Sequence, residues 1–322
     1  MKCYPLQFVP ILKERLWGGT KLGDVLGKPL KSVNTGESWE VSAVPGDVSV
    51  VANGPYAGKD LQRLMEEFGA ALLGQGVIER FGTEFPILIK FIDAKLDLSI
   101  QLHPNDALAK ERHNSFGKTE MWYIMDADPE ARLIVGFNQE MDRERYKNFL
   151  KEDRILEVLN HESVKEGDTF FINTGKIHAI GAGVLLAEIQ QTSDVTYRVY
   201  DFNRRDKQGN LRELHTELAL DAIDFSNKDD FKVSYAKHKN HVNTMVDCTY
   251  FKTDFLNLES DYSKDIQERD AFTILMCVSG EGEVSTTDGS VNVKKGETVL
   301  IPACAPAFTL NTAGIQVLEI TI

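Results

Sequence analysis

The chain has 322 residues, enough to bury a substantial core and, at ordinary domain sizes, to form about two domains. No uninterrupted apolar run approaches the roughly 18 residues that a membrane-spanning helix needs, so we expect no membrane insertion. The formal net charge of -13 repels polyanions, and no cluster of Lys and Arg offsets it, so we expect no nucleic-acid partner. A small anionic substrate is not excluded, because a few cations can make a pocket positive inside a negative molecule.

The first residues, "MKCYPLQFVPILKERLWGG", carry two prolines and a charged Lys-Glu-Arg where a secretory signal would be continuous and apolar. We therefore expect a cytoplasmic protein. The cysteines form no C-x-x-C pair and no disulfide-framework spacing. Reduced thiols, and no zinc-thiolate site, are predicted for all four, which are Cys3, Cys248, Cys277 and Cys304.

Short runs of alternating or β-branched apolar residues, separated by turn residues at close intervals, predict a mainly β protein. In chain order the clearest are "ESWEVSAV", "SVVANG", "FPILIKFIDA", "LDLSIQLHP", "TEMWYIMDA", "ARLIVGF", "TFFINTG", "GVLLAEIQQ" and "VTYRVYDF", and strands return after residue 271. This spacing is typical of a β-sandwich or barrel and not of a βαβ chain.

Helical periodicity, with apolar residues at i, i+3 and i+4, appears at 59–73, 138–160 and 211–224. We expect these helices to pack on the outside of the sheets of the first domain. Around 231–243 the sequence turns polar and basic before the last strands. A domain boundary is therefore predicted near residue 232, between a first domain, 1–232, and a second, 233–322.

One β unit is repeated in the chain. When "KEGDTFFINTGKIHAI" (165–180) is set over "KKGETVLIPACAPAFT" (294–309), Gly, the acidic residue, Thr and Ile coincide at one constant offset. His178 falls on Ala307. Two copies of one unit, of which only the first has a histidine, indicate duplicated barrels with a polar centre in the first alone.

Four side chains in the first copy form a candidate metal site. Gln101 and His103 stand at i and i+2 in "LSIQLHPND", so on a strand both project from one face. Glu120 lies at the start of the next predicted strand, 17 residues after His103, and His178 lies in the repeated unit. Two imidazoles with an amide and a carboxylate oxygen suit Zn²⁺ and leave positions for water or substrate. The competing interpretation is that each is an ordinary polar residue of a strand.

The Gly-acid, apolar run, Gly and His of 167–178 resemble the second half of the cupin signature, and cupins are small jelly-roll barrels that hold a metal. A narrower resemblance covers most of the chain, to the type I phosphomannose isomerase family in its short bacterial form. It rests on "ERLWGG", "GESWEVS", "LSIQLHPND", "FGKTEMWY" and "GKIHAIGAGVLLAEIQQTSDVTYRVYDFNR". The resemblance implies two cupin-type jelly-roll barrels with helical insertions on the first, the second barrel being metal-free.

The resemblance also implies roles for particular residues. One zinc ion per chain would interconvert mannose 6-phosphate and fructose 6-phosphate through an enediol, in a pocket for a phosphorylated hexose. "NTGKIHA" departs from the family's usual Pro-Ala-Gly before the histidine, which affects the loop and not the ligand. The implied zinc ligands are Gln101, His103, Glu120 and His178; the catalytic residues are Arg198 and Lys118; the substrate-binding residues are Ser99, Arg204, Trp17 and Glu37.

Isomerisation through an enediol places negative charge on sugar oxygens, which a fixed positive field must stabilise. One carboxylate and three neutral ligands leave a divalent site at about +1, which preserves its Lewis acidity. Lys118 is expected to have a pKa lowered by the nearby metal, and Arg198 to stabilise the enediolate or hold the phosphate. The proton-transfer base stays open between Lys118 and a zinc-bound hydroxide.

Other interpretations remain at this stage. Without the resemblance, Lys118 solvates a strand end and Arg198 makes an outward ion pair equally well. A sugar-binding or regulatory cupin without turnover is the alternative function, and an iron-dependent cupin dioxygenase is a further one, although the neutral Gln101 fits zinc better. The histidines predicted to be solvated are His113, His161, His215, His238 and His241.

Overall fold

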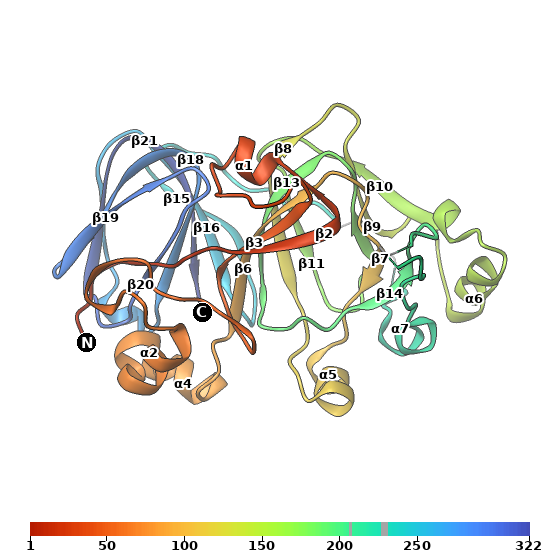
Figure 1. Ribbon diagram of the computed structural model, residues 1–322, viewed down its shortest axis with the longest axis horizontal. Helices are drawn as coiled ribbons and strands as arrows, with labels where there is room; N and C mark the ends of the chain where they lie inside the picture. Colours follow the sequence, from red (N-terminus) through yellow and green to blue (C-terminus); the bar gives the residue numbers. More distant parts are fainter. Residues whose placement is uncertain (206–207, 227–230) are drawn as a thin grey trace.

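Three antiparallel sheets of five or more strands make up most of the described chain, which is residues 1–205, 208–226 and 231–322 of a computed structural model (Figure 1). The prediction of a mainly β protein is confirmed. A six-stranded sheet contributes one face to the candidate site and the other to the contact with the C-terminal sheet. No helix among the described residues is long and apolar enough to cross a membrane.

The central strands of the six-stranded sheet are buried on both faces. Ile87, Ile89 and Phe91 alternate along one strand and pack in a core shared with the C-terminal sheet, whereas Lys90 and Ile92 point to the opposite face. In sheet order its strands are β11 (Thr169–Ile172), β8 (Glu120–Ala127), β13 (Val184–Gln191), β6 (Ile87–Ala94), β3 (Thr35–Val41) and β2 (Ile11–Gly19).

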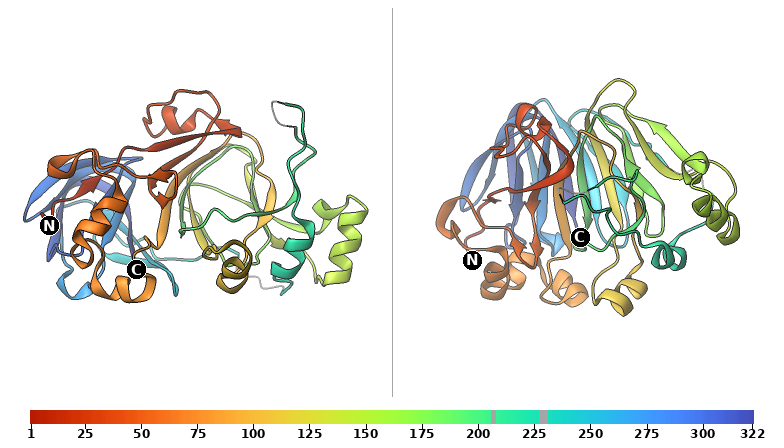
Figure 2. Two further views of the ribbon diagram at one scale, coloured as in Figure 1. Left: turned by 60° about the horizontal axis from the view of Figure 1, so that its bottom comes forward. Right: turned by 45° about the vertical axis from the view of Figure 1, so that its right-hand side comes forward.

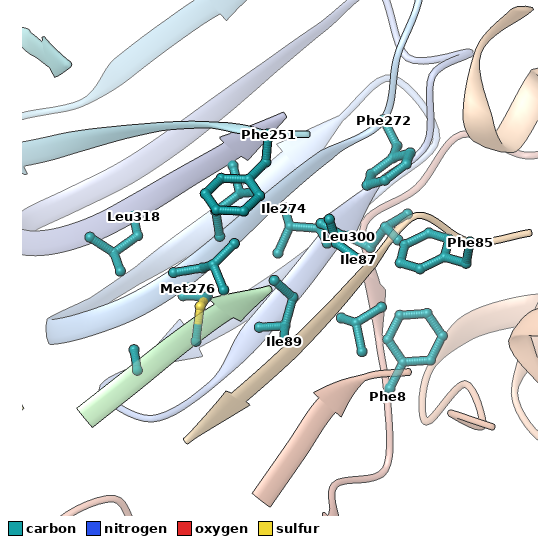
Figure 3. Close-up of a cluster of buried hydrophobic side chains, with 14 of the residues drawn as sticks. Phe8, Phe85, Ile87, Ile89, Phe251, Phe272, Ile274, Met276, Leu300 and Leu318 are labelled. Atoms are coloured by element: carbon teal, nitrogen blue, oxygen red, sulfur yellow. The ribbon is translucent and has the colours of Figure 1, made fainter. Parts of the chain in front are cut away.

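The C-terminal sheet packs on this inner core. Figure 3 shows Ile87 and Ile89 of β6 facing Ile274, Met276 and Leu300. In sheet order its strands are β1 (Leu6–Gln7), β20 (Thr298–Ile301), β18 (Thr273–Thr286), β21 (Ala307–Thr321), β16 (Lys252–Leu258) and β15 (Val242–Asp247), with β17 (Tyr262–Asp265) on β21 and β19 (Gly289–Lys294) on β18.

A five-stranded sheet closes the other side of the first domain (Figure 2, left). Its strands in order are β10 (Leu159–Ser163), β9 (Arg132–Phe137), β12 (His178–Ile180), β7 (Ile100–Leu102) and β14 (Tyr197–Tyr200). Tyr146 of α6 (Arg143–Lys151) and Leu220 of α7 (Thr216–Ala222) pack against its outer apolar face, so these two helices cover it as expected.

The internal repeat is confirmed at the level of single strands. β11 and β20 begin and end at corresponding positions of the two copies. β12 and β21 begin at corresponding positions, but they differ in length. Both turns are built alike, since the carboxylates of Asp168 and Glu297 accept hydrogen bonds from the backbone N–H three residues earlier, at 3.1 and 3.0 Å. The C-terminal sheet has a hydrophobic cluster of its own, which includes Leu275, Val299 and Leu310.

The predicted helices differ from the observed ones. Residues 138–160 contain α6, a 3₁₀ turn η2 (Ile155–Val158) and the start of β10, and 211–215 runs beside β14, because the backbone N–H of His215 donates to the carbonyl of Arg198. The remaining short elements are α1 (Lys21–Asp24), β4 (Ala43–Val44), β5 (Asp47–Val48), η1 (Gly54–Tyr56), α5 (Asp106–His113) and η3 (Gln267–Arg269).

One group of helices makes a contact that the sequence analysis did not predict. The segment 59–73 forms α2 (Leu61–Phe68) and α3 (Ala70–Leu73), followed by α4 (Gln75–Phe81), but these helices also pack against the C-terminal domain (Figure 1). The backbone N–H groups of Ala303 and Cys304 donate to the carbonyls of Leu72 and Ala71. Their apolar stripe buries against that domain because both domains share the core.

The expectation of four reduced thiols is wrong, because Cys3 and Cys304 form a disulfide. Strand β1 pairs with β20, and this brings together two cysteines that are 301 positions apart. Spacing rules detect only local cysteine patterns, so they could not find this pair. Cys248 and Cys277 are free.

Candidate active site

A cavity of about 480 Å³ lies between the five- and six-stranded sheets. Its walls come from both sheets and from the loops at their ends. The lining residues are Arg15, Trp17, Glu37, Trp39, Lys90, Ile92, Leu98, Ser99, Gln101, Lys118, Trp122, Ile180, Glu188, Asp194, Thr196, Arg198 and Arg212. The set includes Lys118, Arg198, Ser99, Trp17, Glu37 and Gln101 from the sequence prediction.

Strand register places three polar side chains in one row on the five-stranded sheet. His178 of β12 pairs with Gln101 of β7, and Gln101 in turn pairs with Arg198 of β14. Directly paired residues of antiparallel strands project from the same face. The row therefore runs from the imidazole through the amide to the guanidinium, and His103, two residues after Gln101, continues the same face.

The facing sheet carries a second row. Glu188 of β13 pairs with Trp122 of β8 on one side and with Lys90 of β6 on the other, and Lys90 pairs with Trp39 of β3. Glu188 accepts hydrogen bonds from Lys90 Nζ and from Trp122 Nε1, both at 3.0 Å. The sequence analysis missed Lys90 and Glu188. The available signal was a charged residue between apolar neighbours in the middle of each of two mainly apolar strands, "FPILIKFIDA" and "GVLLAEIQQ".

Three of the four predicted metal ligands converge at a buried point. The ligand atoms of His103, Glu120 and His178 lie within 4.8 Å of one another, and none of the three residues is more than 1% exposed. His103 Nε2 is 3.6 Å from Glu120 Oε2, and His178 Nε2 is 3.5 Å from Glu120 Oε1. Gln101 is adjacent by register and lines the cavity above them.

The donor set fits a divalent cation. Each histidine makes one contact through Nδ1, to the carbonyl of Val195 at 2.9 Å for His103 and of Lys176 at 2.8 Å for His178, which leaves Nε2 without a hydrogen-bond partner. This is the arrangement that orients metal-binding imidazoles. Ligands about 2.1 Å from a tetrahedral metal stand about 3.4 Å apart, close to the observed separations.

Electrostatics keep the imidazoles neutral, as metal binding requires. Burial lowers the pKa of His178 to about 4 and holds that of His103 well below its usual value, with Lys118 and His178 adding to the effect at His103. Burial raises the pKa of Glu120, although Lys118 opposes this. A buried carboxyl with a raised pKa regains its charge when a cation is bound beside it.

Lys118 lies between two carboxylates. Its Nζ is 2.9 Å from Glu120 Oε2 and 4.0 Å from Glu188 Oε1, and its side chain is 7% exposed. Burial by itself would lower the pKa of Lys118, but Glu120 and Glu188 raise it to about 12 in the metal-free protein. The predicted lowering depended on a bound metal, so it stays a prediction, and the sequence analysis did not consider the two carboxylates. The two carboxylates therefore favour the protonated form of Lys118 in the metal-free protein.

Glu37 and Trp17 both lie at the cavity, as predicted. Arg15 forms a bidentate pair with Glu37, with Nε and Nη2 each 3.0 Å from a carboxylate oxygen, and Trp39 Nε1 donates to the same carboxylate at 2.6 Å. Glu37 is 8% exposed, so its carboxylate is buried in the cavity wall and not solvated. Burial would raise its pKa, but Lys90 and Arg15 lower it.

Of the two predicted arginines, Arg198 lines the cavity and Arg204 does not. Arg198 lines the cavity with its Nε buried and unpartnered, while its Nη1 donates to the carbonyl of Glu213 at 2.9 Å. Arg204 is not among the lining residues, because its guanidinium donates to Asp201 and to the carbonyl of Asp97. Arg212 lines the cavity in its place, held through Nε by Asp201 at 2.6 Å.

His215 is not solvated as predicted. Its Nδ1 accepts a hydrogen bond from the backbone N–H of Arg198 at 3.0 Å, and its own N–H donates to the Arg198 carbonyl. The sequence analysis missed this contact because His215 lies in an irregular segment, outside any strand, that runs along the edge of β14. The segment before α7 thus fixes the backbone of Arg198 from outside the sheet.

The cavity is positive although the chain is acidic. Among the described lining residues five are basic and three acidic, in a chain with a net charge of -13. The basic ones are Arg15, Lys90, Lys118, Arg198 and Arg212. The sequence analysis left room for a small anionic substrate, and this lining is suited to one.

Comparison with known proteins gives consistent results. The family description "Phosphomannose isomerase type I, catalytic domain" matches residues 6–139, and "Mannose-6-phosphate isomerase, cupin domain" matches residues 241–318. The chain is 37% identical over 317 residues to mannose-6-phosphate isomerase ManA of Bacillus subtilis, covering 97% of each. It is 32% identical to the mannose-6-phosphate isomerase of Streptococcus mutans, covering 92% of each. The crystal structure of the mannose 6-phosphate isomerase from Bacillus subtilis superposes with a TM-score of 0.89 at 34% identity, covering 99% of both chains.

Proposed function

Because the chain belongs to the type I phosphomannose isomerase family, we propose that it interconverts mannose 6-phosphate and fructose 6-phosphate in the cavity between its two inner sheets. The observation that carries the proposal is the placing of Lys118, Arg198 and Arg212 around one cavity directly above the buried cluster of His103, Glu120 and His178. Such a site joins a proton donor and fixed positive charge to a candidate metal centre.

The metal proposed for this centre is one Zn²⁺ per chain, held by His103, Glu120 and His178 with Gln101 as fourth ligand. Two imidazoles with a carboxylate and an amide oxygen are a donor set that zinc accepts. When bound, zinc would act as a Lewis acid towards the sugar oxygens at C1 and C2. The unpartnered Nε2 atoms of both histidines are the structural support for this assignment.

The protein's own groups would carry the rest of the reaction. Lys118 Nζ, protonated between Glu120 and Glu188, donates a hydrogen bond to a sugar oxygen whose charge grows as the enediol forms. Arg198 pairs with Gln101 of the neighbouring strand, and its unpartnered Nε would donate a hydrogen bond to the same developing charge. Ser99 and Trp17 line the cavity and shape the sugar subsite.

We assign the phosphate to Arg212 and not to Arg204. Arg212 lines the cavity, while Asp201 holds its Nε and Nη2; among the described residues its Nη1 makes no hydrogen bond. Arg204 shares Asp201 but directs Nη1 to a backbone carbonyl. An arginine held on one edge of its fork and free on the other is preorganised to receive a phosphate oxygen.

The rest of the sequence prediction fits this proposal. Residues 1–232 would be the catalytic cupin domain and 233–322 a metal-free cupin jelly roll, with β1 supplied to the second sheet by the first residues. A substrate charged at phosphate is expected in the cytoplasm, because phosphate esters do not cross membranes unaided. The net charge of -13 makes nucleic acid an unfavourable partner.

The test is a coupled assay on purified, zinc-loaded protein, in which fructose 6-phosphate formed from mannose 6-phosphate drives a change in absorbance. We expect turnover in the wild type and its loss in His178→Ala together with the metal. A protein that binds the sugar phosphate and holds zinc, yet never turns over, would be the non-catalytic cupin instead. Stoichiometric iron in protein purified without added metal would favour the dioxygenase alternative.

A further inference from the structure

Lys118 lies just before the regular hydrogen-bond ladder of the six-stranded sheet. Strand β8 begins at Glu120, and the ladder with β13 extends to Thr119, whose carbonyl accepts from the backbone N–H of Gln191 at 3.1 Å. Among the described backbone pairs, Gly117 and Lys118 are not part of this ladder. The backbone N–H of Lys118 has only a long contact, 3.4 Å, to the carbonyl of Pro104. A side chain meant to stay within hydrogen-bond distance of substrate needs a backbone that is fixed from elsewhere.

Two side chains supply that support on either side of Lys118. The backbone N–H of Gly117 donates to Asp106 Oδ1 at 2.8 Å, and the backbone N–H of Thr119 donates to Gln191 Oε1 at 2.8 Å. Gln191 Nε2 donates to the same Asp106 oxygen at 3.1 Å and so joins the two supports. Gly117 passes close to the start of α5, since a Cβ there would meet the backbone of Asp106 at 2.7 Å.

The remaining oxygen of Asp106 is bound by the other domain. Tyr250 OH donates to Asp106 Oδ2 at 2.6 Å. Tyr250 lies in the turn between β15 and β16 of the C-terminal sheet, next to Phe251, which is 1% exposed in the core between the domains (Figure 3). Burial and Asp106 raise the pKa of Tyr250 to about 12, so its hydroxyl remains a donor at working pH.

We propose that the metal-free C-terminal domain positions the Lys118 segment of the active site through Tyr250 and Asp106. Tyr250 is a positioning residue, since it acts through Asp106 on the backbone at 117–119. The C-terminal domain, which lacks the histidine of the first copy, would thereby still contribute to turnover. Its contribution to turnover rests on the proposed isomerase function, whereas its contribution to the order of the segment does not.

The experiment compares Tyr250→Phe with the wild type, both loaded with zinc, by amide hydrogen exchange and by steady-state kinetics. Losing one hydrogen bond to a charged group should speed exchange in a peptide covering 115–120 by about tenfold. A loosened Lys118 should lower kcat by about tenfold with KM within about twofold. If Tyr250 only stabilised the fold, exchange would not accelerate selectively at 115–120, and kcat would not fall while KM stayed nearly unchanged.

Tyr235→Phe is the matched control. Tyr235 OH also bridges to the first domain, donating to the carbonyl of Gly167 at 2.7 Å, but Gly167 has no contact with 117–119 in the described hydrogen bonds. This variant should leave kcat and exchange at 115–120 unchanged. Exchange in β16 reports global destabilisation in either variant.

Unchanged exchange at 115–120 in Tyr250→Phe, or equal acceleration in β16, would overturn the proposal. Faster local exchange with unaltered kcat would overturn its link to turnover. If the wild type itself shows no isomerase activity, the proposed function fails, while the exchange measurement still decides whether Tyr250 orders the segment.

Discussion

Replacing Arg212 by Ala tests which arginine receives the phosphate. The Arg212 side chain is 24% exposed and is anchored through Nε and Nη2 on Asp201, leaving Nη1 for substrate. Asp201 keeps Arg204 as a partner in the variant, so the local structure should persist. A charge-assisted hydrogen bond to phosphate at a partly exposed site contributes about 2 kcal/mol, which corresponds to about a thirtyfold loss of kcat/KM.

The assay follows fructose 6-phosphate formation at several mannose 6-phosphate concentrations, with inorganic phosphate as competitor. Arg212→Ala should raise KM and weaken inhibition by inorganic phosphate to a similar degree, and Arg212→Lys should fall between it and wild type because the planar fork is lost. Arg204→Ala should change kcat/KM by less than about threefold, as expected for a group outside the site. The assignment is refuted if Arg204→Ala costs as much as Arg212→Ala, or if inhibition by phosphate is the same in both.

Three further predictions concern charge, covalent linkage and the catalytic arginine. The pKa of Glu37 is lowered in the folded chain, so its carboxylate stabilises the fold above the unfolded pKa of about 4.5, and this contribution disappears as pH falls through the folded pKa. Urea unfolding between pH 7 and pH 3 should therefore give a difference in the free energy of unfolding between wild type and Glu37→Gln that narrows only below about pH 4.5. A constant difference would contradict it. Removing the Cys3–Cys304 link should lower the free energy of unfolding by about 2–4 kcal/mol without changing kcat, and Cys3→Ser should be insensitive to dithiothreitol, unlike wild type. Arg198→Ala should retain its zinc, measured by elemental analysis, and lose most of its turnover; loss of zinc would show that Arg198 supports the metal centre instead.

Sequence patterns predicted the parts of the site that have local signatures. Gln101 and His103 are two apart on one strand face, and His178 stands where its repeat partner Ala307 has no polar group. The offset between the copies is reproduced by the observed bounds of β11 and β20. Period-two alternation and an internal repeat are local or periodic features, so they can be recognised without the fold.

The other features depend on register between distant strands. Lys90 and Glu188 form a buried pair only because β6 and β13 are neighbours, and each strand alone has the composition of a core strand. Arg212 replaces Arg204 at the cavity because the chain turns back along β14 after Asp201. Tertiary placement of this kind carries no periodic signal, and the link between Cys3 and Cys304 has the same origin.

The central claim is that His103, Glu120 and His178, with Gln101, hold one divalent metal on which isomerisation depends. The most direct measurement removes metal from the purified wild-type protein with a chelator, restores zinc stepwise, and records bound metal and turnover at each step. We predict that turnover is absent without metal and rises in proportion to bound zinc up to one per chain. Full turnover in metal-free protein, or zinc binding that is unchanged in His178→Ala, would contradict the account.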